Sequence, residues 1–286
     1  MARVVVVTDS TSYLPDGLAS AHGLIVVPLQ VVLGGRSLAE GIEVDSAEVA
    51  EALLAGRSVT TSRPSPALFA QTYRDAARAA GEDVELVSVH LSADLSGTVD
   101  AARIAAREVA DEGVTVRVVD SRNLALGLGF AALAAARAAA AGEPAEQVAE
   151  RAARCAYDTG TWLYVDTLEY LRRGGRVGAA AAVVGSALSV KPLLQLVDGR
   201  IEPLERVRTA SRALARLEEI VVGAVGTRRV DVGVQHLAAA DRAAELAERL
   251  RARLPGLGTL YVGEVGAVIG AHAGPGLVGV VSAPAG

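Results

Sequence analysis

Four short segments rich in hydroxyl side chains follow predicted strands or open predicted helices. They are residues 8–12, 60–62, 92–98 and 120–123. The carboxyl ends of parallel strands meet at one edge of a sheet, where open α/β folds bind their ligands. Hydroxyl groups and the free N–H groups of helix N-termini together favour an anion. Helix capping and turn formation explain any one segment better, but the four together predict a site for a carboxylate or a phosphate.

The histidines offer a base or a cation to such a site. Of His22, His90, His236 and His272, the last has the most informative surroundings, because the Gly- and Pro-rich residues 269–276 predict a sharply turned, exposed backbone. An imidazole there could bond to or neutralise an anion, and its pKa should rise if it pairs with a carboxylate. A histidine of a solvated turn is the alternative. We expect His22 on the surface and His90 in a structural role.

Patterns for catalysis and for metal binding are weak. Nucleophilic catalysis by serine needs a base and a group that orients it, and the sequence contains no G-x-S-x-G elbow. No group of His, Cys, Asp and Glu has the spacing of metal ligands, and Cys155 is the single cysteine. We therefore expect no catalytic residue, no metal and no cofactor.

A basic segment forms a second candidate for binding. Residues 168–176 predict a short helix that ends at Gly-Gly, with Arg172, Arg173 and Arg176 at its end. Residues 170–216 contain nine Lys or Arg and three acids, a net charge of +6, so the rest of the chain carries −11 of the total of −5. Cations favour a helix C-terminus, and guanidinium groups also bind phosphate and acidic side chains. The asymmetry indicates an acidic partner or a phosphate, with a solvated basic face as the alternative.

Composition limits the kind of ligand. Hydrophobic residues make up 51% of the 286 residues but aromatic residues only 3%, so a cavity should have aliphatic walls. This argues against a base-stacking site for nucleic acid, and the net charge of −5 predicts no attraction to DNA. We find no apolar run of about 20 residues and no signal peptide, and we expect a cytoplasmic protein.

The elements that must position these residues form an α/β fold with two domains. In residues 1–155, alternating strands and helices predict a mostly parallel sheet with flanking helices. The predicted strands are 3–7, 24–32 (interrupted by Pro28), 84–91 and 114–119, and the predicted helices are 45–56, 65–81, 97–111 and 125–141. Residues 156–286 predict a mixed or antiparallel sheet, because Asp198-Gly199 is typical of a two-residue hairpin turn. Its predicted strands are 162–165, 193–197, 200–206, 230–235, 259–264 and 277–281, with helices at 209–221 and 238–253.

Taken together, these residues resemble the DegV family, the fatty-acid-binding subunits of bacterial fatty acid kinase systems. The resemblance covers nearly the whole chain in order: residues 8–12, 61–66, 91–98, 120–121, 168–176, 190–192 and 269–276. This sequence departs from the family at two positions. Leu91 stands where a second serine is common, and Arg63 stands where glutamine is frequent.

The resemblance implies that the protein buries a long-chain fatty acid in an aliphatic cavity. The hydroxyl groups of Thr61 and Ser92 would hold the carboxylate, with His272 nearby. Ser62 and Ser96 are reserve candidates for the same contact.

The resemblance also implies a partner. In such systems an ATP-dependent kinase subunit phosphorylates the bound acid to an acyl-phosphate, and Arg173 and Arg176, with Arg172, would face that kinase. The protein would then present its ligand without being a catalyst. Two alternatives remain open: a hydrolase or phosphotransferase that uses Ser92 or Ser96 with His272, and an adaptor whose basic window binds an acidic protein.

Overall fold

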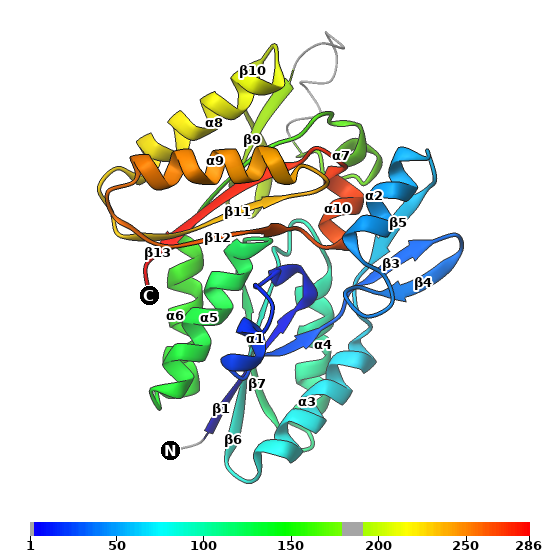
Figure 1. The fold of residues 1–286 in the computed structure, drawn as a ribbon. Helices are drawn as coiled ribbons and strands as arrows, with labels where there is room; N and C mark the ends of the chain where they lie inside the picture. Colours follow the sequence, from blue (N-terminus) through cyan, green and yellow to red (C-terminus); the bar gives the residue numbers. More distant parts are fainter. Residues whose placement is uncertain (1–2, 179–190) are drawn as a thin grey trace. The chain divides into compact units, whose positions relative to one another are not determined.

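The structure, a computed structural model, describes residues 3–178 and 191–286 (Figure 1). The chain divides into two compact units. The first comprises Met1–Gln30 and Ser62–Asp158, and the second comprises Val31–Thr61 and Thr159–Gly286. The predicted division at residue 155 placed residues 31–61 in the first domain, whereas their contacts group them with the second unit.

The first unit is built on a parallel sheet with the strand order β2-β1-β6-β7. Helices α3 and α4 pack together on this sheet, as do α5 and α6 (Figure 1). The sheet is enclosed by helices, which explains why β1 is almost continuously apolar. The bounds are β1 (Arg3–Asp9), β2 (Ile25–Val27), β6 (Val84–His90), β7 (Thr115–Asp120), η1 (Ser10–Ser12), α1 (Leu18–Ala21), α3 (Pro66–Ala80), α4 (Thr98–Ala110), α5 (Leu126–Ala140) and α6 (Ala145–Tyr157).

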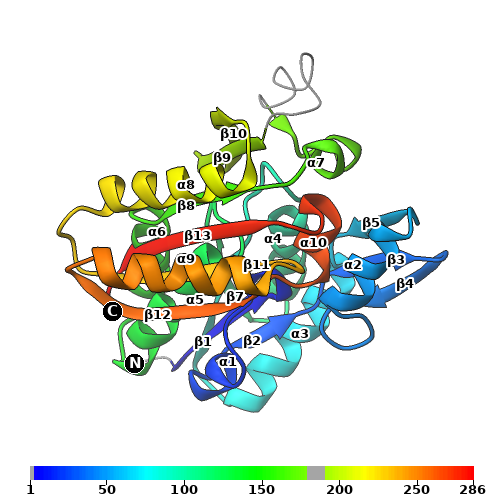
Figure 2. The ribbon, with the colours of Figure 1, turned by 45° about the horizontal axis from the view of Figure 1, so that its top comes forward.

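The second unit contains a mixed sheet with the order β10-β9-β8-β13-β11-β12, in which only the β11–β12 pair is parallel among the described residues. Helices α8 and α9 lie along one face of it (Figure 2) and bury an apolar core against the strands. The predicted hairpin is confirmed, since β9 and β10 join through Asp198 and Gly199, both with positive φ. The bounds are β8 (Gly160–Tyr164), β9 (Lys191–Val197), β10 (Arg200–Val207), β11 (Val230–His236), β12 (Leu257–Glu264), β13 (Val278–Pro284), α8 (Ala210–Val225) and α9 (Ala240–Arg253).

Residues 31–61 contribute a small sheet with the order β4-β3-β5, and a helix, α2, that packs on α10. The bounds are β3 (Gln30–Leu33), β4 (Arg36–Ala39), α2 (Ser46–Leu54) and β5 (Val59–Ser62). Two short helices later in the chain also belong to the second unit: α7 (Glu169–Arg173) and α10 (Ala267–Ala273). Residues 24–32 were predicted as one strand interrupted by Pro28; the interruption is confirmed, but the two parts are separate strands of different sheets. Pro28 has no N–H to donate and ends β2 at Val27, after which the chain enters a different sheet.

The predicted starts of two helices, at Asp45 and at Ser65, are confirmed. Asp45 caps α2 and forms a capping box with Glu48, in which each side chain accepts a hydrogen bond from the other residue's backbone N–H. Ser65 caps α3, Pro66 is its first residue, and Gly81 ends it with a φ of +92°. The predicted α/β class, with a parallel sheet and a mixed sheet, is confirmed.

Candidate functional site

Two of the predicted site residues, Thr61 and His272, are hydrogen-bonded to each other in the second unit. Thr61 Oγ1 lies 2.7 Å from His272 Nε2, although 211 positions separate the two residues in the sequence. Thr61 belongs to β5 and His272 to α10. The packing of α2 on α10 holds residues 31–61 against this end of the unit, so the fold brings the pair together.

His272 lies in a helix, so the prediction of an exposed turn was wrong. Gly270 does not break α10, because it is packed closely against Leu237, where a Cβ atom would come within 3.2 Å of a methyl group. The helix ends only at Gly274, which has a φ of +78°. The N-terminus of α10 is held by the buried Glu40, whose Oε1 accepts a hydrogen bond of 2.6 Å from the Val268 N–H. A carboxylate at a helix N-terminus is stabilising, and packing here outweighs the low helix propensity of glycine.

The second ring nitrogen of His272 faces the end of α7. Its Nδ1 atom is buried and has no hydrogen-bond partner among the described residues. Gly174 lies beside it, so close that a Cβ atom on Gly174 would overlap Nδ1. Burial, with a smaller contribution from the Arg176 charge, lowers the pKa of His272 to about 4. The imidazole is therefore neutral at pH 7. A carboxylate bound beside the ring is predicted to raise the pKa of His272, which is opposite to the effect of burial.

The three predicted arginines do lie at the end of α7, but they have different surroundings. Arg172 and Arg173 each form an ion pair of 2.8 Å with Glu169, and their side chains are 55% and 67% exposed. Arg176 donates a hydrogen bond to the Gly174 carbonyl and lies close enough to His272 to lower its pKa. Two guanidinium groups thus face solvent, and the third belongs to the surroundings of His272.

In the first unit, three of the four hydroxyl-rich segments meet at the carboxyl ends of the parallel strands, as predicted. The Ser92 N–H donates to the Asn123 carbonyl at 2.8 Å, and the Ala93 N–H donates to Asp120 Oδ1 at 3.2 Å. The Ser92 side chain is fully buried, and its Oγ accepts a hydrogen bond of 3.2 Å from the Asp94 N–H. Ser92 is therefore held in place by its own loop and by the loop after β7.

The fourth segment and the reserve candidates lie elsewhere. Residues 60–62 belong to β5, in the small sheet, so their expected place at the edge of the parallel sheet was wrong. Val59, Thr60 and Thr61 are β-branched residues, which suit a strand. Ser62 is exposed, and Ser96 bonds to Thr98 Oγ1 at 2.8 Å, at the start of α4. The Arg63 side chain packs on Gly97 and thereby places a cation beside Ser96.

A buried hydrogen-bonded network of polar side chains was not predicted from the sequence. Asp9 Oδ2 lies 3.0 Å from His90 Nδ1, His90 Nε2 lies 2.7 Å from Ser88 Oγ, and Ser88 Oγ lies 2.8 Å from Tyr73 Oη. The order Asp, His, Ser resembles a catalytic triad, but all three side chains are fully buried and Ser88 Oγ is bonded to both His90 and Tyr73. The Leu91 N–H also donates to Asp9, at 3.1 Å. The network therefore ties β1 to the end of β6, just before Ser92.

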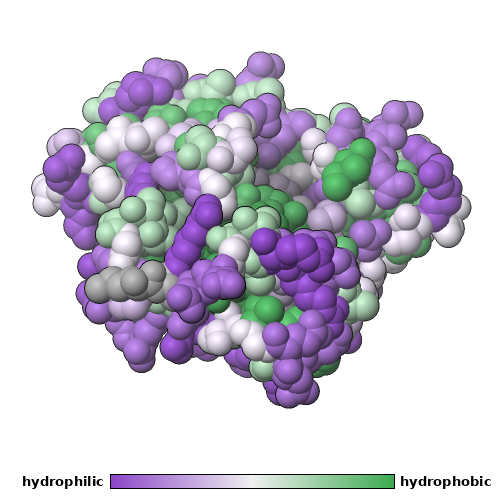
Figure 3. Space-filling model, turned by 90° about the horizontal axis from the view of Figure 1, so that it is seen from below, coloured by the Kyte–Doolittle hydropathy of each residue, from purple (hydrophilic) through white to green (hydrophobic). Residues whose placement is uncertain are grey.

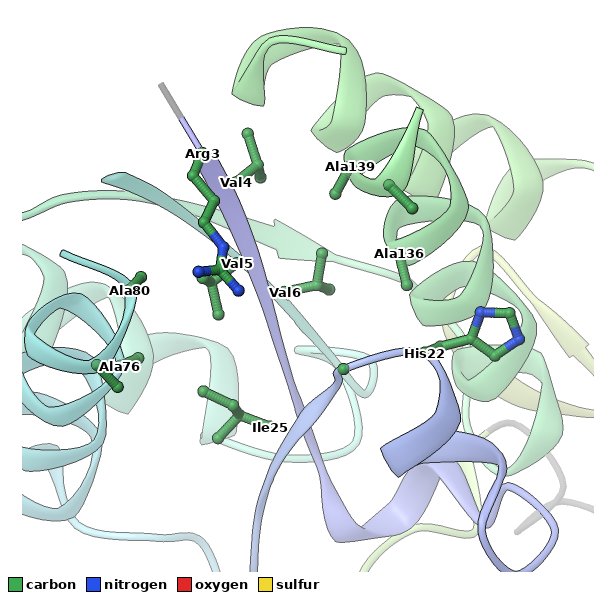
Figure 4. Close-up of a pocket in the computed structure, with 13 residues that line it drawn as sticks. Arg3, Val4, Val5, Val6, His22, Ile25, Ala76, Ala80, Ala136 and Ala139 are labelled. Carbon is green, nitrogen blue, oxygen red and sulfur yellow. The ribbon is translucent and has the colours of Figure 1, made fainter. Parts of the chain in front are cut away.

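A cleft of about 360 Å3 opens at the amino end of β1 (Figure 4). Its walls are mainly aliphatic, as the composition predicts, and Arg3 and His22 add polar groups. The strands run parallel, so this cleft lies at the opposite end of the sheet from Ser92. It is therefore separate from Ser92. The aliphatic lining comes from β1, Ile25, α3 and α5: Val4, Val5, Val6, Ala76, Ala79, Ala80, Ala136, Ala139 and Ala140.

Other kinds of site receive no support from residues 3–178 and 191–286. Within these ranges, no group of three or more His, Cys, Asp and Glu side chains is arranged to hold a metal ion, and no helix is long and apolar enough to cross a membrane. Exposed large apolar side chains such as Ile42, Leu54 and Tyr157 belong to different elements. On the face shown in Figure 3, apolar residues form separate patches among polar ones.

Comparison with known proteins settles the family. A family model described as an uncharacterised protein of the DegV family matches residues 3–285. The chain belongs to the DegV family. A DegV domain-containing protein of Streptomyces coelicolor is 59% identical over 279 residues, which cover 98% of both chains. The resemblance inferred from the motifs is thereby confirmed.

Solved DegV structures have the same fold. A DegV family protein from Thermus thermophilus, described as binding fatty acid, is 35% identical, with a TM-score of 0.92 over 99% of this chain and 100% of that one. DegV from Bacillus subtilis, described as a fatty acid binding protein, is 31% identical, with a TM-score of 0.87 over the whole of both chains. The described residues of this chain therefore have the DegV fold.

Proposed function

We propose that this DegV protein binds a long-chain fatty acid and that the Thr61 hydroxyl, fixed by His272, donates a hydrogen bond to the carboxylate. The hydrogen bond between Thr61 and His272 carries the proposal. It sets a hydroxyl group beside a neutral imidazole, in a chain related to proteins that are described as fatty acid binding.

The chemistry of the ligand explains why both parts of such a site are needed. Burial of an acyl chain is favourable by about 25 cal/mol per Å2 of apolar surface. The ionised carboxylate, by contrast, must keep hydrogen-bond donors when it leaves water. We propose the Ser92 hydroxyl as a second donor, with Ser62 and Ser96 in reserve. Of these three serines, Ser92 is held most firmly in position, since hydrogen bonds fix its loop on both sides.

The protein in this proposal presents the acid and leaves the chemistry to a partner. A kinase subunit would transfer a phosphoryl group from ATP to the exposed carboxylate oxygen. The solvent-facing Arg172 and Arg173 would contact that kinase, with Arg176 behind them. Their exposure and positive charge support this role, as does the ability of guanidinium groups to bind acidic surfaces.

No specific observation favours the alternative function, a hydrolase that uses Thr61 or a serine together with His272. A histidine acting as a base needs a third group to orient it. His272 Nδ1 has no such partner among the described residues, and the one Ser–His–Asp chain that they contain is fully buried.

Mass spectrometry of an organic extract from the purified protein tests the proposal. We expect a long-chain fatty acid in the extract, or its uptake when palmitate or oleate is added to the delipidated protein. An extract without acyl species, together with no uptake of either acid, would show that the proposed function is wrong.

A further inference from the structure

Gly174 and Gly175, which end α7, are glycines for different reasons. Gly175 has a φ of +72°, a conformation that favours glycine whatever its neighbours. Gly174 has a φ of −75°, which any residue adopts readily. The backbone therefore does not require glycine at position 174, and the reason must lie in what surrounds its missing side chain.

What surrounds it is the imidazole of His272. A Cβ atom on Gly174 would overlap Nδ1 and would come within 2.9 Å of Cε1. The flexible end of a surface side chain could move aside at little cost. This ring cannot do so easily, since Nε2 on its far side is held by Thr61 at 2.7 Å.

The surroundings of Nδ1, which lies against Gly174, bear on which ring nitrogen carries the proton. Nδ1 is buried without a hydrogen-bond partner among the described residues. A proton there would be a buried donor without an acceptor, which is costly, whereas a proton on Nε2 has Thr61 Oγ1 as its acceptor. The neutral ring therefore carries its proton on Nε2 and donates it to Thr61 Oγ1. The Thr61 hydroxyl hydrogen is then free to be donated to another group.

We propose that Gly174 is a positioning residue for head-group binding, because it holds the His272 ring in the Nε2–H form that leaves the Thr61 hydroxyl as a donor to a carboxylate. This inference rests on the proposed function. It also couples the basic turn to the head group, because Arg176 donates a hydrogen bond to the Gly174 carbonyl.

The test compares Gly174→Ala with Gly223→Ala in titrations of delipidated protein with oleate. Gly223 is a matched control, since it lies in α8 with no atom within 4 Å of an added Cβ and without a positive φ. We expect Gly174→Ala to weaken oleate binding about tenfold or more, the effect of losing a hydrogen bond to a charged group, and Gly223→Ala to leave it unchanged. Equal affinities for Gly174→Ala and the wild type would overturn the inference.

A double-mutant cycle separates this role from a general loss of structure. In a His272→Ala background the ring is absent, so Gly174→Ala should have little further effect on oleate binding. A tenfold loss that persists in that background would mean that Gly174 acts on the fold and not through His272.

Nitrogen-15 NMR of the imidazole gives a readout that does not depend on fatty acid binding. The His272 signals are identified by their loss in His272→Gln. We expect the proton on Nε2 in the wild-type protein, and a shift of the His272 signals in Gly174→Ala but not in Gly223→Ala. A proton on Nδ1 in the wild-type protein would contradict the inference. If the wild-type protein shows the Nε2–H form but binds no oleate, the proposed function fails while the Gly174 contact stands.

Discussion

Replacing Thr61 with valine removes the hydroxyl group on which the proposed site depends and nearly preserves the shape of the side chain. The lost atom, Oγ1, lies 2.7 Å from His272 Nε2. A hydrogen bond to a charged group contributes about 1.5–3 kcal/mol. The dissociation constant for oleate should therefore rise about 10- to 150-fold. The Nε2–H of His272 also loses its acceptor, so we expect the free energy of unfolding to fall by about 1–3 kcal/mol.

Isothermal titration calorimetry of delipidated protein with oleate measures the first effect, and urea denaturation measures the second. Thr61→Ser is the matched control, since it keeps the hydroxyl group and should bind oleate with nearly the wild-type affinity. If folded Thr61→Val binds oleate as tightly as the wild-type protein, the hydroxyl does not contact the carboxylate and the reasoning is refuted.

Three further predictions follow from the same structure. Asp9→Asn should lower the free energy of unfolding in urea by about 3 kcal/mol, because the buried carboxylate accepts hydrogen bonds from Thr11, His90 and Leu91; a loss below 0.5 kcal/mol would show the network to be dispensable. The folded pKa of His272, about 4, lies below its unfolded value near 6.5, so unfolding takes up a proton and stability should fall as pH drops from about 6.5 to 4, by up to roughly 3 kcal/mol. His272→Gln should flatten that part of the stability–pH curve, and an unchanged curve would refute the assignment. Arg173→Glu should keep oleate binding and lose acyl-phosphate formation with the partner kinase, unlike the exposed control Arg103→Glu; lost oleate binding would place Arg173 in the ligand site instead.

Much of the fold could be predicted because its signals are local. Ser65-Pro66 and the Asp45/Glu48 pair begin helices through hydrogen bonds within one turn. Asp198-Gly199 fixes a hairpin through two residues of positive φ. Each of these signals is complete within a few residues, so no distant part of the chain was needed to interpret it.

Features that depend on distant contacts could not be predicted in this way. The sequence around Pro28 shows that a strand is interrupted, but not that the chain then enters another sheet. His272 stands among glycines that predict a turn, but the packing of α10 on α2 and Leu237 keeps residues 267–273 helical, and the helix ends only at Gly274.

The candidate site was predicted in part. His272 was singled out by its Gly- and Pro-rich surroundings, but only the family resemblance paired it with Thr61, since no spacing rule joins residues 211 positions apart. Gly174 was noticed only as the end of a helix. A glycine followed by a second glycine suggests a cap, and nothing in the sequence distinguishes the one needed for φ from the one needed for space beside an imidazole. Asp9, His90 and Ser88 were likewise invisible as a network, because strand pairing between β1 and β6 brings them together.

The central claim is that the protein recognises the carboxylate of a fatty acid, and a comparison of oleate with methyl oleate tests it most directly. Both ligands carry the same acyl chain, but the ester has no ionised carboxylate to accept a charged hydrogen bond from Thr61. In calorimetric titrations of delipidated protein we expect oleate to bind and methyl oleate to bind at least about tenfold more weakly. Equal affinities for the two ligands, or no binding of oleate, would contradict the claim.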